Sequence, residues 1–160
     1  MVGRVEGECT LHAWNAVFVV AWEGPTTIAG MRRIDSAMQS LRGTHSAVSA
    51  VHFMQGQPIL PSAELREEFN RVAKAHQRAI ACTAILDNRA GFVASAIKAV
   101  ITGVGMIAGA RHDMRLFSEL SPLVDWVVAK HREHAGVLLD VSALREALTT
   151  VQKARVGSST

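Results

Sequence analysis

The chain has 160 residues, of which 49% are hydrophobic and 19% are charged, and its formal net charge is +3. This length fits one domain, and the apolar content is high enough to offset the entropy lost on ordering, so a disordered protein is excluded. Lys and Arg alternate with acids, as at 66–68 and 130–133, and there is no basic run or aromatic platform. We therefore expect no nucleic-acid partner.

The cysteines and the N-terminal residues indicate a cytoplasmic protein. Cys9 and Cys82 are too far apart to form a metal knuckle, and Cys82 lies in an apolar run, as a core thiol does. The first residues carry charge where a secretory signal has an apolar stretch. The apolar run 90–110 is interrupted by Lys98 and three glycines, so we interpret it as a buried helix and expect no membrane span.

The first third of the chain predicts two strands, a helix and a third strand. Residues 10–14 and 16–22 have strand patterns joined by a turn at Trp14 and Asn15. Gly24 and Pro25 then open a helix that Gly43 ends. On this helix Ile28, Met31, Met38 and Leu41 share one face, whereas Arg32, Arg33, Asp35 and Arg42 lie elsewhere. Residues 47–54 alternate as a third strand.

The rest of the chain alternates helices with strands. A loop at 55–61 leads into a helix that begins at Pro61 or Ser62 and ends near Gln77. Strands follow at 79–86 and 115–117, separated by the helix that runs through the apolar stretch to about Gly109. Ser121 and Pro122 match an N-cap and first-turn proline, and a last amphipathic helix follows Gly136.

Strands separated by helices favour parallel pairing with right-handed crossovers, and the opening hairpin makes the sheet mixed. The predicted fold class is therefore α/β, with a mixed, mostly parallel five-strand sheet covered by helices. We place this domain at residues 1–136, and a C-terminal amphipathic helix with a frayed tail at 137–160.

The order of these elements resembles the STAS fold of bacterial anti-sigma factor antagonists and their SpoIIAA-like relatives. Residues 15–25 read Asn-Ala-Val-Phe-Val-Val-Ala-Trp-Glu-Gly-Pro, which is similar to the second strand of the family entering its first helix. Residues 116–127 read Leu-Phe-Ser-Glu-Leu-Ser-Pro-Leu-Val-Asp-Trp-Val, which resembles the closing segment of the SpoIIAA-like group. The likeness covers about residues 8–134 and implies a STAS-like regulatory module without enzymatic activity.

In phosphorylated antagonists of this family, the loop after the third strand carries an Asp-Ser-Ser-Gly-like motif at a helix N-terminus. The matching place here reads Leu-Pro-Ser-Ala-Glu at 60–64, where Ser62 alone retains a hydroxyl. We expect Ser62 to act as a plain N-cap and to carry no phosphate. The resemblance makes this loop and helix start the candidate partner-binding region, with Gln55, Gln57, Ser62, Glu64 and Arg66.

The predicted helix at 90–110 has apolar side chains all around its axis, whereas a helix on the outside of a sheet has a polar face. On the last helix, one stripe holds Val141, Leu144, Leu148 and Val151. If the stripe packs on its own domain, it covers the apolar helix; if it packs on a second copy, the same areas form a two-fold interface. We expect a homodimer to form, and the candidate interface residues are Phe92, Ile97, Ile101, Leu144 and Leu148.

The sequence contains no complete catalytic or metal-binding signature. His131 and His134 stand three apart but have no third ligand nearby, and no Gly-x-Ser-x-Gly motif is present. We predict no catalytic, cofactor-binding or metal-binding residue, although a role for His52 stays open. The favoured function is a regulatory protein-interaction module with a protein partner. The alternatives are a small-molecule or lipid-binding domain that uses helix 90–110, and an enzyme with a dispersed site.

Overall fold

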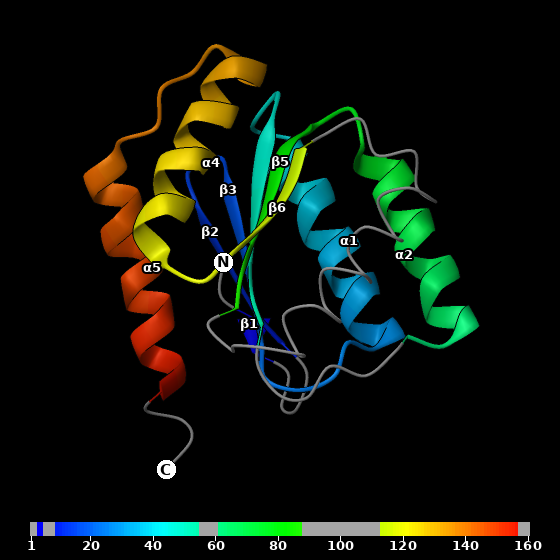
Figure 1. Ribbon diagram of the computed structural model, residues 1–160. Helices are drawn as coiled ribbons and strands as arrows, with labels where there is room; N and C mark the ends of the chain where they lie inside the picture. The colour runs from blue at the N-terminus through cyan, green and yellow to red at the C-terminus, as the bar shows by residue number, and fades with distance from the viewer. Residues whose placement is uncertain (1–2, 5–8, 55–60, 88–112, 157–160) are drawn as a thin grey trace.

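A computed structural model describes residues 3–4, 9–54, 61–87 and 113–156 (Figure 1). The strands form one sheet in chain order, with β1–β2 and β2–β3 antiparallel and all later pairs parallel. They are β1 (Gly3–Arg4), β2 (Cys9–Trp14), β3 (Val17–Trp22), β4 (Val48–Phe53), β5 (Ile80–Leu86) and β6 (Asp113–Phe117). The predicted five-strand mixed sheet is confirmed, with the two-residue β1 added at its edge.

Helices cover both faces of this sheet (Figure 1). On one side lie α1 (Ile28–Arg42) and α2 (Ala63–His76), and on the other lie α4 (Leu120–Ala135) and α5 (Val141–Val156). Because both faces are covered, every residue of β3 and β5 is buried, which explains why β3 is entirely apolar and β5 is apolar except for Thr83. The hairpin before β3 turns at Asn15, whose φ of 50° suits an asparagine.

Each face has its own apolar core. Under α1 and α2, the core joins side chains of β2 and β3 to Met31, Ile34 and Met38 of α1 and to Leu65 and Val72 of α2. Under α4 and α5, the core joins alternate residues of β3, β4 and β5 to the inner faces of both helices. The strand alternation therefore separates two layers of helices that share one sheet.

Two helix starts differ from the sequence prediction. The first helix begins at Ile28 and not at Gly24 and Pro25, because the hydroxyl of Thr27 accepts a hydrogen bond from the Gly30 amide at 3.0 Å. The helix after β6 begins at Leu120, so Ser121 lies inside its first turn and is not the N-cap.

The early start of α4 follows from packing. Leu120 packs against the same core as Leu123, Val124 and Val127. These positions recur at i, i+3, i+4 and i+7, which is one face of a helix, so helical geometry at Leu120 places its partly buried side chain on the face that packs against the core. Gly136 ends α4 in the left-handed conformation, with φ of 68°, as its predicted place between two helices requires.

The terminal helix α5 packs on its own domain. Asp140 caps it, because its carboxylate accepts a hydrogen bond from the Ala143 amide at 2.8 Å. Leu144 and Leu148 are fully buried in the same core as α4 and β3, and Val151 is buried beside them. The expected dimer contact through Leu144 and Leu148 is therefore wrong for these two side chains, because the sheet and α4 of the same chain already cover them.

The remaining candidate interface residues, Phe92, Ile97 and Ile101, lie outside the described residues, as does the whole predicted helix around them. Among the helices that the structure describes, none has the length and apolar character needed to cross a membrane.

The burial of Leu144 on α5 predicts how much this side chain contributes to the free energy of unfolding. Leu144→Ala removes a fully buried side chain and should lower the free energy of unfolding by about 3 kcal/mol, within the range for core leucines. Leu138→Ala is the matched control, because Leu138 is 68% exposed just before the same helix, and it should change stability by less than about 0.5 kcal/mol. Urea denaturation measures both, and equal stability of the two variants would contradict the packing of α5.

Candidate interaction surface

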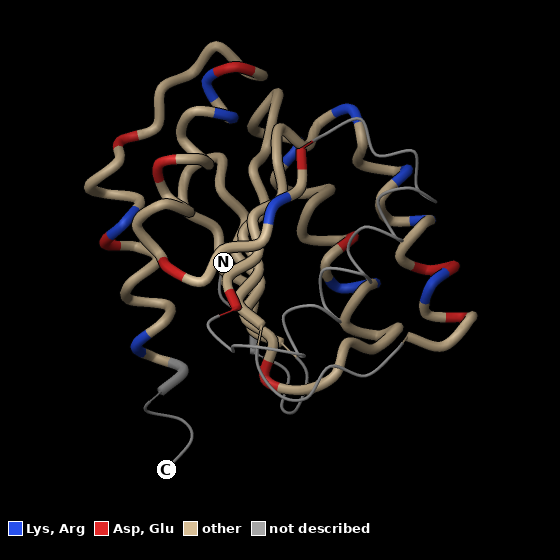
Figure 2. The backbone as a smooth tube through the Cα atoms, in the orientation of Figure 1, with Lys and Arg blue, Asp and Glu red and all other residues tan. Residues whose placement is uncertain are grey.

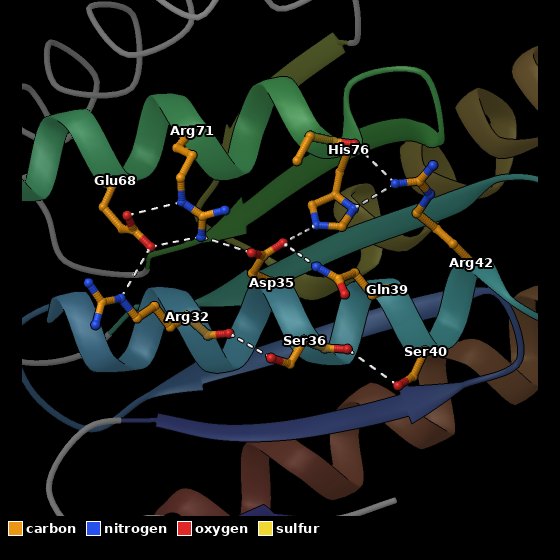
Figure 3. Close-up of polar contacts among 10 residues, drawn as sticks. Arg32, Asp35, Ser36, Gln39, Ser40, Arg42, Glu68, Arg71 and His76 are labelled. Carbon is orange, nitrogen blue, oxygen red and sulfur yellow. Dashed lines mark hydrogen bonds and ion pairs between the residues drawn. The ribbon is translucent and has the colours of Figure 1, made fainter.

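Asp35 is a buried carboxylate between α1 and α2 (Figure 3). Its Oδ1 atom lies 2.7 Å from Nε2 of His76, and its Oδ2 atom accepts a hydrogen bond from Nη2 of Arg71 at 2.8 Å. Gln39, one turn further along α1, donates to Oδ1 at 3.3 Å. One side chain of α1 thus holds two residues of α2.

The prediction that Asp35 lies away from the apolar face of its helix is wrong. Asp35 is buried on the side that carries Met31, Ile34 and Met38. Its neighbours explain why burial is tolerated, since a buried carboxylate needs hydrogen-bond donors and a nearby cation, and α2 supplies both.

His76 is the buried partner of Asp35 and links it to Arg42. Only 1% of His76 is exposed, and its Nδ1 atom lies 3.2 Å from Nη1 of Arg42. A guanidinium can only donate and an ionised carboxylate can only accept, so the two contacts require a neutral ring with the proton on Nε2. Nη1 of Arg42 also donates to the carbonyl of Ala75 at 3.0 Å, which fixes the end of α1 to the end of α2.

The same network continues towards solvent. Arg71 donates from Nε to Oε2 of Glu68 at 3.1 Å and from Nη2 to Oε1 at 2.8 Å, and Arg32 of α1 lies 3.7 Å from that carboxylate. Charges of opposite sign therefore alternate across the two helices, from Arg32 through Glu68 and Arg71 to Asp35 (Figure 3).

The ionisation of Asp35 follows from this arrangement. Burial on its own would raise the pKa of Asp35, but the hydrogen bonds from Arg71, His76 and Gln39 and the charge of Arg71 outweigh burial. The pKa of Asp35 therefore lies below its ordinary value, and the carboxylate is ionised at neutral pH.

The predicted partner-binding residues that the structure describes lie at the start of α2. Ser62 is the N-cap, as predicted, and its hydroxyl accepts a hydrogen bond from the Leu65 amide at 3.1 Å. Glu64 and Arg66 are exposed on the first turn, and Arg66 donates to the carbonyl of Pro61 at 3.0 Å. Gln55 and Gln57 lie outside the described residues.

Sequence reasoning did not identify Asp35, Arg71 and His76 as a group. Asp35 and His76 are 41 positions apart, so no local motif joins them. One signal was present, because Asp35 stands four positions after Met31 and three before Met38, which puts a carboxylate on the apolar stripe. A charged residue at a core position indicates a buried partner elsewhere in the chain.

His52 and Trp22 form a second polar contact under α1 and α2. Nε1 of Trp22 donates to Nδ1 of His52 at 3.3 Å, so the ring of His52 carries its proton on Nε2 when neutral. Burial lowers the pKa of His52 to about 4, which keeps the ring uncharged at neutral pH. This histidine accepts a hydrogen bond from a core indole.

On the opposite face, His131 is part of a buried chain of weak donors. Sγ of Cys82 donates to Oγ of Ser49 at 3.4 Å, and Oγ of Ser49 lies 3.0 Å from Nδ1 of His131. His131 is buried while His134 is exposed, so the two histidines face different surroundings. Within the described residues, no three His, Cys, Asp or Glu side chains are grouped as metal ligands.

The buried position of Asp35 predicts a pH-dependent loss of stability. Asp35→Asn should lower the free energy of unfolding at pH 7 by about 1–3 kcal/mol, because Arg71 and His76 lose a charged acceptor. Since the folded-state pKa is lowered, this contribution is complete above the ordinary value of 3.8 and is lost as the pH falls through the lower folded-state pKa. The difference between wild type and variant should therefore shrink below about pH 4.

Urea denaturation at several pH values measures that difference. Asp125→Asn is the control, because Asp125 is exposed and its carboxylate lies 3.5 Å from Arg145, which is itself exposed. It should change stability by less than about 0.5 kcal/mol at any pH. A stabilising role of the ionised Asp35 is contradicted if Asp35→Asn changes the free energy of unfolding no more than this control does. It is also contradicted if the loss of stability in Asp35→Asn grows as the pH falls.

A search of solved structures finds the same fold in an uncharacterised protein of the DUF3478 family from Shewanella loihica PV-4, described as having a SpoIIAA-like fold. The match has a TM-score of 0.55 and 12% sequence identity, and it covers 79% of this chain and 98% of that chain. No protein-family model and no curated protein matches this chain. At this identity the match shows the fold alone, and it confirms the predicted resemblance: this chain has a SpoIIAA-like fold.

Proposed function

We propose that this chain is a regulatory module without enzymatic activity, which binds a protein partner through the exposed surface of α1 and α2. We call this area the α1–α2 surface, and it includes the first turn of α2 with Ser62, Glu64 and Arg66. The SpoIIAA-like fold is compatible with such a role.

The observation that carries the proposal is the buried joint at Asp35. It fixes α2 to α1 through directional hydrogen bonds, so the charged side chains around it are presented at set positions. A surface that is already ordered loses less conformational entropy when a partner binds. The joint therefore supports a role in recognition.

The chemistry of the joint also favours binding over catalysis. A histidine beside a carboxylate resembles an acid–base pair, but both nitrogens of His76 are engaged, by Asp35 and by Arg42. The ring is 1% exposed, so a substrate cannot reach it without separating the helices. We assign this pair a structural role.

The test is quantitative binding to a partner captured from the native cell extract. A tagged wild-type chain should enrich a protein, identified by mass spectrometry, whose affinity is then measured with both purified proteins. The double variant Glu64→Arg/Arg66→Glu reverses two exposed charges without changing the net charge, and it should weaken that affinity at least tenfold.

The matched control is Glu146→Arg/Lys153→Glu on the exposed side of α5, which also keeps the net charge. It should bind the partner within twofold of wild type. The proposal fails if no protein is enriched, if both double variants bind equally well, or if the purified chain shows turnover that is lost in His52→Ala.

A further inference from the structure

We propose that one end of the α1–α2 surface binds carboxylates of an acidic segment in the protein partner, an inference that rests on the proposed function. This end carries Arg42, Lys74 and Arg78. Arg42 is the last residue of α1, Lys74 lies in the last turn of α2, and Arg78 directly follows the C-cap of α2. We call these three residues the basic end.

The layer formed by α1 and α2 carries an excess of positive charge. Residues 28–78 contain seven Lys and Arg but four Asp and Glu, an excess of three that equals the net charge of +3 of the whole chain. The four acids are Asp35, which is buried in the joint, and Glu64, Glu67 and Glu68 in the first half of α2. In Figure 2 the acidic segments of α2 lie near its start, with one basic segment between them, and the charged segments towards its end are all basic.

The acids neutralise Arg32 and Arg71, and they leave the basic end without a carboxylate. Glu68 lies between Arg32 and Arg71, and Asp35 takes the other contact of Arg71. Among the residues that the structure describes, no Asp or Glu pairs with Arg42, Lys74 or Arg78. An acidic segment of a partner would supply the missing charge.

Contacts within the chain already hold the guanidinium of Arg42 in a position to bind a carboxylate. Its Nη1 atom is fixed by the carbonyl of Ala75 and by Nδ1 of His76, and the tautomer of that ring is set by Asp35. No hydrogen bond within the described part of the chain uses its Nε or Nη2 atoms. A planar guanidinium with one edge anchored and other donors unused suits recognition of a carboxylate.

A cation near a helix C-terminus also stabilises the helix dipole. That effect accounts for the contact of Arg42 with the Ala75 carbonyl, and it needs one cation. It does not explain why Lys74 and Arg78 are both exposed beside it with no acid. We therefore assign the three cations together to binding.

The experiment uses a fluorescein-labelled octapeptide of alternating Asp and Glu, titrated with the full chain and followed by fluorescence anisotropy. Arg42→Lys keeps the charge but removes the planar donors, and it should weaken binding at least fivefold. Lys74→Glu/Arg78→Glu should weaken it at least tenfold. Circular dichroism melts establish that each variant is folded at the assay temperature.

The matched control is Arg132→Glu/Lys153→Glu, which makes the same charge change at exposed positions on α4 and α5. It should bind the peptide within twofold of wild type. The inference is overturned if this control weakens binding as much as Lys74→Glu/Arg78→Glu, or if Arg42→Lys binds like wild type. Tighter binding of labelled octathymidylate than of the acidic peptide would also overturn it, in favour of nucleic acid.

The same variants separate this inference from the proposed function. A captured partner that loses affinity for Glu64→Arg/Arg66→Glu but binds Arg42→Lys and Lys74→Glu/Arg78→Glu like wild type would refute the basic end and leave the proposed function standing. Specific binding of the acidic peptide without any captured partner would support the basic end while the proposed function fails.

Discussion

A single buried carboxylate, Asp35, is the constraint on which the rest of the α1–α2 surface depends. An ionised group in an apolar layer is tolerated only where donors and a cation surround it. Arg71 and His76 meet that requirement from α2, and in doing so they fix which residues of α2 face α1. Arg71 in turn pairs with Glu68, and Glu68 pairs with Arg32. Arg42 contacts His76, so its position also depends on Asp35.

The two faces of the sheet are stabilised by different means. Under α4 and α5 the core is mostly apolar, and it includes the buried polar contact of Ser49 with His131. Apolar packing is not directional, so it holds α5 in place without fixing an outer pattern of charge. The other face adds a directional polar joint at Asp35, which fixes the charged side chains bonded to it.

The sequence was sufficient for the parts of the fold that depend on local pattern. Unbroken apolar strands, the serine N-cap at Ser62 and the leucine stripe of α5 all follow from spacing along the chain. Whether Leu144 and Leu148 meet their own domain or a second copy could not be predicted, because a stripe shows that a face is covered but not by what. Asp35 was missed for a related reason, since its partners stand 36 and 41 positions away.

The protonation of the His76 ring tests the central claim most directly, because the ring can satisfy both of its neighbours in one tautomer only. Long-range proton–nitrogen correlation spectra of the ¹⁵N-labelled chain at neutral pH distinguish the two neutral tautomers from the charged ring. The account predicts a neutral His76 with its proton on Nε2, donating to Asp35, and with Nδ1 accepting from Arg42. A ring protonated on Nδ1, or on both nitrogens, would contradict it.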